Sequence, residues 1–218
     1  VRMVRYGREP PDVAFWRNLL ADAVMLRRDM LQLDAITDSY RVVHAEADSL
    51  PGLVIDKFGD VLSAEVFSLG MFQRAGALLE LLAPLCGARH WLIQPGPHTL
   101  AQEGFEATPV MSDDCPGEIA VQEFGTQFRV RFQGGHKTGF FCDQRENRKL
   151  LAAHCRDKSV LDLCCYTGGF AVQALRLGQA KSVTGVDLDE TPLQLARENA
   201  RLNRVEAKFV QADAFPYM

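Results

Sequence analysis

The stretch VLDLCCYTGGFAVQAL, from Val160 to Leu175, decides the fold of the C-terminal part of this chain. An apolar run that contains Asp162 is followed by a tight turn with glycines, and then by apolar residues at helical spacing. This strand–turn–helix order is typical of a nucleotide-binding fingerprint. However, Cys164 and Tyr166 stand where the usual pattern has its first two glycines. The stretch alone therefore indicates either a cofactor site or an ordinary joint between a strand and a helix.

The segments around this stretch repeat the same alternation. A helix is expected over about 143–154, followed by strands over 159–163, 181–187 and 207–211 and helices over 169–177 and 191–203. Strands that alternate with helices predict a parallel sheet in a doubly wound layer. The predicted fold class is therefore α/β, with a Rossmann-like core.

The N-terminal part has a different pattern. Apolar residues at helical spacing predict one long amphipathic helix over 12–33, with Asp12 as its N-cap. From Tyr40 the period changes to short strands separated by Pro-Gly and Gly-Asp turns, which predict antiparallel pairing. The expected domains are a linker helix over 1–36, a central α+β domain over 37–132 and the first part of the Rossmann-like domain over 133–218.

Composition limits the function classes. The 218 residues carry a net charge of −4, so no global positive field indicates nucleic-acid binding, although a local basic face is compatible with it. The six cysteines form no CxxC pair, so no zinc site is expected and free thiols in a reducing cytoplasm are the simplest interpretation. No signal peptide or membrane-spanning run is visible.

Three acids fall at the ends of the predicted strands, namely Asp162, Asp187 and Asp213. In an open α/β sheet, ligands bind beyond the carboxyl ends of the strands. Asp187 follows Asp162 by about the offset at which an acid meets ribose hydroxyls. Asp213 could accept a hydrogen bond from an adenine amino group. Three acids at successive strand ends favour a cofactor site over a plain joint.

The turn itself favours S-adenosylmethionine over NAD. Gly168 and Gly169 let backbone approach a ligand, and free N–H groups of the turn would face the ligand's polar end. A dinucleotide site needs a second glycine where backbone meets the pyrophosphate, and Tyr166 stands there instead. S-adenosylmethionine has no pyrophosphate. An NAD-dependent oxidoreductase remains an alternative, which a titration with NADH and S-adenosylmethionine would distinguish.

Four stretches of the chain resemble the large-subunit ribosomal RNA cytosine-5 methyltransferase family, the RlmI-like proteins. These stretches are DLCCYTGGFAVQA, VTGVDLDETPLQLARENARLN, HAEADSLPGLVIDKFGDVL and GHKTGFFCDQRENR. The resemblance covers nearly the whole chain. It implies a class I methyltransferase with an N-terminal PUA-like domain, a linker helix, a central domain and a Rossmann-like domain. On this resemblance the chain is a fragment that lacks the PUA-like domain and the C-terminal catalytic segment.

The resemblance also implies roles for individual residues. Asp187 would bind the ribose and Asp213 the adenine edge. Transfer to carbon 5 of cytosine needs a cysteine thiolate that adds at carbon 6, and this nucleophile is expected beyond Met218, so the chain alone is predicted inactive. The other implied cofactor residues line the turn or reach the methionine end: Asp162, Tyr166, Thr167, Gly168, Thr138, Gln144 and Arg145.

Several alternatives stay open. The same core could methylate another ribosomal RNA atom such as guanine N7, or the chain could be a non-catalytic fragment that binds S-adenosylmethionine or RNA. Cys164 and Cys165 are interpreted as packing of the turn, since free cysteine is usually a small buried hydrophobe. His136 and Lys137 could touch RNA phosphate or lie in a solvated loop. The expected partner is large-subunit ribosomal RNA, and an unpaired edge strand would allow a homodimer.

Overall fold

A computed structural model describes residues 9–96, 99, 101, 103–132 and 140–218. The chain divides into two compact units, one that ends at Ile119 and one that begins at Ala120. Each unit has its own sheet and helices, so each is described separately. No helix of the described residues is both long enough and apolar enough to cross a lipid bilayer.

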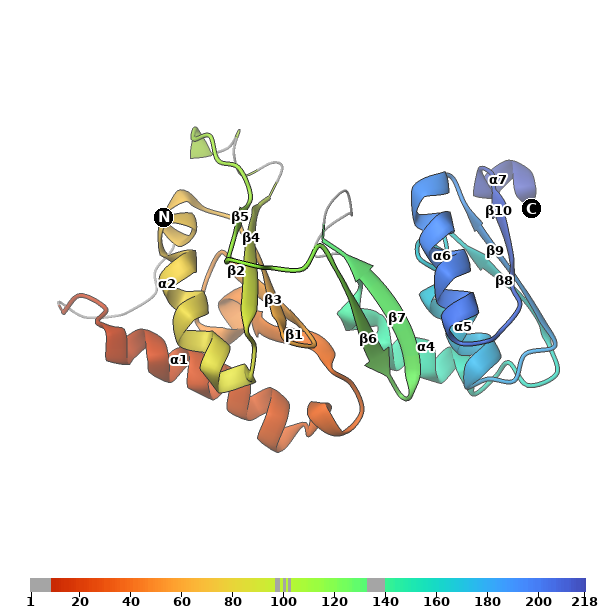
Figure 1. Cartoon of the computed structure of the whole chain (residues 1–218), viewed down its shortest axis with the longest axis horizontal. Coiled ribbons are helices and arrows are strands. Elements are labelled where there is room, and N and C mark those ends of the chain that lie inside the picture. The colour runs from red at the N-terminus through yellow and green to blue at the C-terminus, as the bar shows by residue number, and fades with distance from the viewer. Residues whose placement is uncertain (1–8, 97–98, 100, 102, 133–139) are drawn as a thin grey trace. The chain divides into compact units, whose positions relative to one another are not determined.

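The N-terminal unit contains a five-stranded mixed sheet and the helices α1 and α2 (Figure 1). The strand order is β1-β2-β3-β4-β5, with β3 and β4 parallel and the other neighbours antiparallel. Its elements, in chain order, are α1 (Val13–Met25), η1 (Leu26–Met30), η2 (Leu33–Ala35), β1 (Ser39–His44), η3 (Ala45–Asp48), β2 (Leu53–Phe58), β3 (Val61–Val66), α2 (Leu69–Cys86), β4 (His90–Pro95) and β5 (Val110–Met111).

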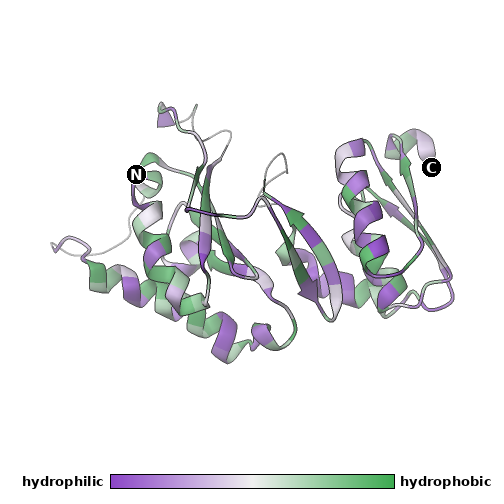
Figure 2. Ribbon diagram, viewed as in Figure 1, coloured by the Kyte–Doolittle hydropathy of each residue, from purple (hydrophilic) through white to green (hydrophobic). Residues whose placement is uncertain are grey.

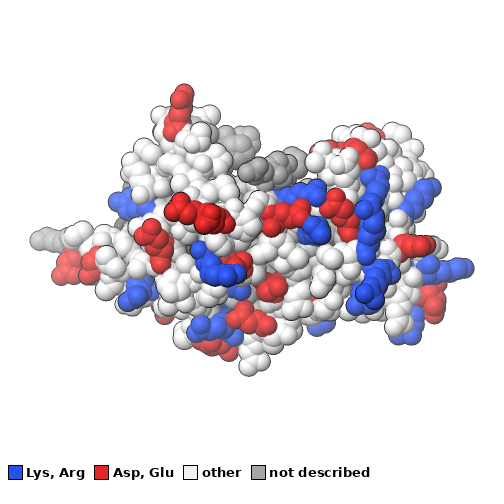
Figure 3. All heavy atoms as spheres, viewed as in Figure 1, with Lys and Arg blue, Asp and Glu red and all other residues white. Residues whose placement is uncertain are grey.

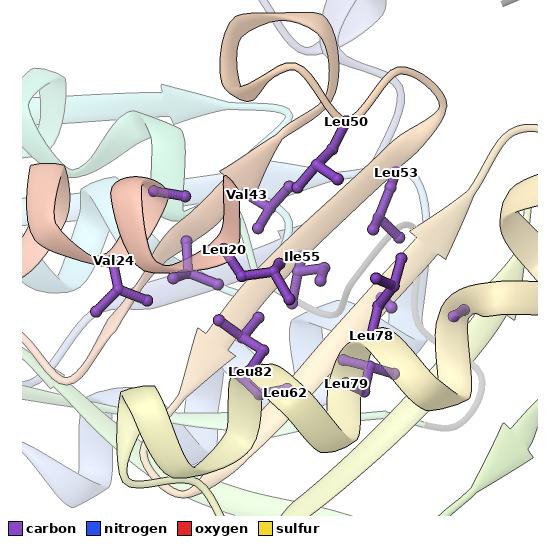
Figure 4. Close-up of a cluster of buried hydrophobic side chains, with 14 of the residues drawn as sticks. Leu20, Val24, Val43, Leu50, Leu53, Ile55, Leu62, Leu78, Leu79 and Leu82 are labelled. Atoms are coloured by element: carbon purple, nitrogen blue, oxygen red, sulfur yellow. The ribbon is translucent and has the colours of Figure 1, made fainter. Parts of the chain in front are cut away.

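The core of this unit lies where α1 and α2 pack on the sheet. Leu20 of α1, Leu79 and Leu82 of α2 and Ile55 of β2 are fully buried and point toward one another (Figure 4). Hydrophobic residues follow the inner faces of both helices, whereas hydrophilic residues mark their outer faces (Figure 2). Burial of this apolar surface is the main stabilising contribution, at about 25 cal/mol per Å² removed from water.

The predicted long helix over 12–33 is present with a change of winding. Asp12 is its N-cap as predicted, because its carboxylate accepts a hydrogen bond of 2.8 Å from the Phe15 N–H. The α-helical part ends at Met25, and one π-helical segment continues it to Met30. Gln32 then adopts a left-handed conformation with φ +52°, which ends the helix.

The C-terminal unit contains the predicted parallel sheet, in the order β10-β9-β8. The strands β8, β9 and β10 and the helices α4, α5 and α6 lie within about two residues of the predicted ranges, whereas α7 was not predicted. The elements are β6 (Glu118–Glu123), β7 (Thr126–Arg131), η4 (Cys142–Gln144), α4 (Arg145–Ala152), β8 (Ser159–Leu163), α5 (Gly169–Arg176), β9 (Ser182–Asp187), α6 (Glu190–Leu202), β10 (Lys208–Gln211) and α7 (Ala214–Tyr217).

The β6–β7 hairpin belongs to the C-terminal unit. The sequence predicted a domain boundary after this hairpin, at residue 132, whereas the compact units divide before most of it. Side-chain amides of α5 and α6 explain the difference. The fully buried Gln173 accepts a hydrogen bond of 2.8 Å from the Thr126 hydroxyl and donates to the Glu123 carbonyl. Asn203 bonds both the N–H and the carbonyl of Gln127.

Candidate cofactor-binding site

The turn after β8 has an unusual backbone. Cys164, Tyr166 and Gly168 all have positive φ, at +57°, +49° and +76°. Positive φ is uncommon for a residue with a side chain and is often found at functional sites. A methyl group on Gly168 would lie 3.0 Å from the Cβ of Ala196, so glycine also lets α6 approach the turn.

Four N–H groups at this turn and in the first turn of α5 bond within the protein. Those of Cys165 and Gly168 donate to the carbonyls of Val186 and Cys165, at 3.0 and 2.8 Å. Those of Tyr166 and Ala171 donate to carboxylates, at 2.8 and 3.0 Å. These four N–H groups are therefore already paired and are not available to a pyrophosphate group.

Asp187 lies at the carboxyl end of β9 and holds the turn in place. One carboxylate oxygen accepts a hydrogen bond from the Tyr166 N–H, and the other accepts one of 3.1 Å from the Asp189 N–H. Each carboxylate oxygen has two lone pairs, so Asp187 retains acceptor capacity for a ligand hydroxyl. Asp187 therefore fixes the turn and offers negative charge at the edge of the sheet.

Asp162 lies one residue before the end of β8, opposite Gly185 of β9. Its carboxylate accepts the Ala171 N–H bond in the first turns of α5. Burial, with a further contribution from the negative charge of Asp187, raises the pKa of Asp162 to about 6, although the Ala171 hydrogen bond opposes the rise. At neutral pH the site therefore holds a poorly solvated negative charge, which a cationic ligand group would stabilise.

A small cavity of about 90 Å³ opens beside the turn. The edge of the Tyr166 ring meets the Phe141 ring, with centroids 5.3 Å apart and a T-shaped arrangement. Gln144 lines the cavity, and its side-chain oxygen accepts a hydrogen bond from Asn147. Thr167 is buried. The lining residues are Phe140, Phe141, Gln144, Arg148, Cys164, Cys165, Tyr166, Thr167, Gly169 and Phe170.

A buried ion pair that the sequence analysis missed supports this cavity. The Arg148 guanidinium donates two hydrogen bonds to the fully buried Glu123 carboxylate and a third, of 3.0 Å, to the Phe141 carbonyl. It also lies 4.7 Å from the centroid of the Phe140 ring. Arg148 thus connects β6 to the wall of the cavity. Only its long-range partner distinguishes it from a surface helix arginine, so no local signal could have identified it.

Asp213 and two exposed apolar residues extend the site along the sheet edge. Asp213 follows β10 and caps α7, where its carboxylate accepts a hydrogen bond of 2.9 Å from the Phe215 N–H. Leu188 and Phe215 are 70% and 84% exposed. Both follow acids at strand ends, Asp187 and Asp213. Large exposed apolar side chains beside polar groups are a common feature of ligand sites.

The predicted residue Arg145 is not among the residues that line the cavity. The Arg145 guanidinium donates to the neighbouring Glu146 carboxylate at 3.2 Å. Thr138 lies outside the described residues, as do His136 and Lys137.

The cysteines differ in their environments. Cys165 is buried, as expected for packing of the turn, and burial raises the pKa of its thiol to about 12. Burial likewise raises the pKa of Cys86 to about 11 and those of Cys115 and Cys155 above the ordinary value. Cys164 was expected to pack in the turn, but its left-handed backbone leaves the side chain exposed at the cavity.

Comparison with known proteins places the chain in a family. Residues 41–213 match the model of the S-adenosylmethionine-dependent methyltransferase family, and the chain belongs to that family. The ribosomal RNA large subunit methyltransferase I of Escherichia coli K12 is 37% identical over 215 residues, which cover 95% of this chain and 53% of the relative. The chain thus spans about half the length of the curated relatives that it matches.

Solved structures agree on the fold. A Streptococcus mutans protein assigned to the SAM-dependent methyltransferases superimposes with a TM-score of 0.82 at 22% identity, over 97% of this chain and 55% of that one. The SAM-dependent methyltransferase from Agrobacterium tumefaciens superimposes with a TM-score of 0.59 at 18% identity, over 83% of this chain and 54% of that one. The predicted class I methyltransferase fold is therefore confirmed.

Substitution of Asp162 by asparagine is expected to stabilise the chain at neutral pH. The native pKa of about 6 lies above the ordinary value of 3.8, so the native state binds more protons and the free energy of unfolding falls between about pH 4 and 6. Asparagine retains an acceptor for the Ala171 N–H without the buried charge. We expect Asp162→Asn to add about 1–3 kcal/mol at pH 7. Urea denaturation across this pH range checks this, and an unchanged pH dependence would contradict it.

Proposed function

We propose that the C-terminal unit binds S-adenosylmethionine at the carboxyl ends of β8, β9 and β10. The observation that carries the proposal is the placement of Asp187, which fixes the glycine turn and leaves acceptor capacity at the sheet edge. A carboxylate suits the vicinal hydroxyls of the ribose. Bound there, S-adenosylmethionine would supply the methyl group for transfer.

The chemistry of the remaining groups fits this cofactor. Asp162 would meet the ammonium group of the methionine end, because a cation stabilises a poorly solvated carboxylate. Leu188 and Phe215 would cover the faces of adenine, and Asp213 would accept from its amino group. The N–H groups of Cys165, Tyr166 and Gly168 are bonded within the protein, and this pairing favours S-adenosylmethionine, which has no pyrophosphate, over a dinucleotide.

The methionine end would lie in the small cavity. Tyr166, Thr167 and Gln144, which line this cavity, would contact the methionine end, and Gly168 would contact it from the turn. Arg145 and Thr138 remain proposed contacts of the methionine carboxylate, for which a guanidinium fork is well suited. Arg145 would then exchange its exposed Glu146 partner for the ligand.

We further propose that the whole protein methylates carbon 5 of a cytosine in large-subunit ribosomal RNA, in the cytoplasm. The similarity to the Escherichia coli enzyme supports a ribosomal RNA substrate. Transfer to this carbon needs a reactive thiolate. Burial raises the pKa of four thiols of this chain, which disfavours their thiolates. On the resemblance to the cytosine-5 methyltransferase family, we propose that the nucleophile comes from outside these residues and that the chain alone is inactive.

The experiment uses the whole protein that contains this chain, with unmethylated large-subunit ribosomal RNA and S-adenosylmethionine labelled in its methyl group. We expect label in 5-methylcytidine after digestion to nucleosides and mass spectrometry, and no label when this chain replaces the whole protein. Label in a methylated guanosine, or in no nucleoside, would contradict the proposed target. Transfer by this chain alone would contradict the external nucleophile.

A further inference from the structure

A basic groove lies between β7 and α6 of the C-terminal unit. Its volume is about 560 Å³, and its lining residues are Arg129, Arg131, Glu198, Arg201 and Leu202. Three arginines against one glutamate give this groove a positive charge in a chain whose net charge is −4. Figure 3 shows basic side chains gathered on this unit. The groove is thus positively charged, although the chain as a whole has a net negative charge.

We propose that this groove binds the phosphodiester backbone of the RNA substrate. The inference rests on the proposed function and adds a contact surface outside the cofactor site. All three cationic side chains are arginines, whose planar forks donate two parallel hydrogen bonds to phosphate oxygens. Phosphate contacts of this kind hold a nucleic acid in position without reading its sequence.

The walls of the groove are held together by asparagine side chains. The Asn199 side-chain oxygen accepts a hydrogen bond of 2.8 Å from the Arg129 N–H, and the Asn203 oxygen accepts one of 2.9 Å from the Gln127 N–H. The Asn203 amide also donates to the Gln127 carbonyl at 2.6 Å. These bonds fix β7 along α6, so the arginines of both elements are preorganised and less ordering entropy is lost on binding.

The same asparagine connects the groove to the cofactor turn. Asn199 is fully buried, and its amide donates a hydrogen bond of 3.0 Å to the carbonyl of Thr167. One side chain therefore bonds both the Arg129 backbone and the turn. The groove and the proposed cofactor site thus belong to one unit and are linked through Asn199, which favours the RNA substrate over an acidic protein as the occupant.

The one acid in the groove does not block this use. Glu198 accepts a hydrogen bond of 2.8 Å from Arg131, and the two side chains are 31% and 38% exposed. A partly exposed pair of this kind contributes about 0–1 kcal/mol. A phosphate group can therefore replace Glu198 as the partner of Arg131 at little cost.

The test compares RNA binding by this chain and by two triple variants. The groove variant is Arg129→Gln/Arg131→Gln/Arg201→Gln. The control is Arg17→Gln/Arg156→Gln/Arg176→Gln, which removes the same charge at exposed positions elsewhere. The probe is a fluorescein-labelled single-stranded RNA of mixed sequence, followed by fluorescence polarisation at several salt concentrations. Circular dichroism checks that each variant is folded, and the single variant Arg201→Gln serves if the groove variant is not.

We expect the groove variant to bind the RNA at least about tenfold more weakly and to lower the slope of log affinity against log salt by about 2. For Arg201→Gln we expect a slope lower by about 0.7. The control should bind within about twofold of the wild type on the same electrostatic grounds. Equal binding by the groove variant and the wild type would overturn the proposal. An equal loss of RNA affinity in the control variant would also overturn the proposal. Displacement of the labelled RNA by polyglutamate as effectively as by unlabelled RNA would overturn it as well.

Titration of the same variants with S-adenosylmethionine separates the two proposals. The groove variant should keep the wild-type affinity for S-adenosylmethionine. If the wild type binds no S-adenosylmethionine but the groove variant loses RNA, the cofactor proposal fails and the groove is supported. If S-adenosylmethionine binds and RNA binding is unchanged in the groove variant, the groove proposal alone fails.

Discussion

Replacement of Glu123 by leucine is expected to lower the free energy of unfolding of this chain by about 3–5 kcal/mol, because it leaves the charge of Arg148 buried without a partner. Glu123 is fully buried and Arg148 is only 2% exposed, so water cannot take the place of the carboxylate. Arg148 also contacts Phe140 and the Phe141 carbonyl at the cavity, so we expect S-adenosylmethionine to bind more weakly as well. Urea denaturation and a cofactor titration measure the two effects.

The double variant Glu123→Leu/Arg148→Met is the control for this interpretation. Removal of both charges should recover much of the stability that the single variant loses, because apolar residues can often replace a buried ion pair. A single variant that loses less than about 1 kcal/mol would show that the pair behaves as an exposed one. Equal losses in the single and double variants would show that packing, not charge, determines the effect.

Replacement of Gly178 by alanine is expected to lower the free energy of unfolding by about 3 kcal/mol, at the upper end for overpacking. A methyl group there would lie 2.5 Å from the Ala174 carbonyl oxygen and 2.6 Å from the Ala152 carbonyl oxygen. Both atoms belong to backbone, so a side-chain rotation cannot relieve the overlap. The end of α5 would have to move away from α4, which carries Arg148. Thermal and urea denaturation measure the loss.

The same substitution in α2 provides the matched control. A methyl group on Gly76 would meet no atom within 4 Å. Alanine there should raise the free energy of unfolding by about 0.5–1 kcal/mol, because glycine in a helix loses more backbone freedom on folding. If the two variants changed stability in the same direction, the close approach at Gly178 would be contradicted.

Local sequence patterns were sufficient to predict the strands and helices of the parallel sheet. β8 coincides with the predicted strand over 159–163, and α6 lies within one residue of the predicted helix over 191–203. Such elements have a clear period, so burial of one face specifies them. The acids at the strand ends could be found for the same reason, since the end of a strand pattern locates the ligand edge of an α/β sheet.

Contacts between distant residues could not be predicted in this way. Gln173, Asn199 and Asn203 occupy ordinary positions in amphipathic helices, yet their amides fix the β6–β7 hairpin to the C-terminal unit. Because the partners are 47 to 76 residues away, no local pattern contains them. The bond from the Tyr166 N–H is a further example, because Asp187 reaches Tyr166 only after the sheet has formed.

The most direct test of the account is an isothermal titration of this chain with S-adenosylmethionine, alongside Asp187→Ala and Asp113→Ala. Asp113 is an exposed acid of the N-terminal unit, so its variant controls for charge. We predict that the wild type and Asp113→Ala bind alike, and that Asp187→Ala binds about 10- to 100-fold more weakly, since hydrogen bonds to a charged group contribute about 1.5–3 kcal/mol. A folded wild type that gives no binding, or an Asp187→Ala variant that binds as tightly, would contradict the account.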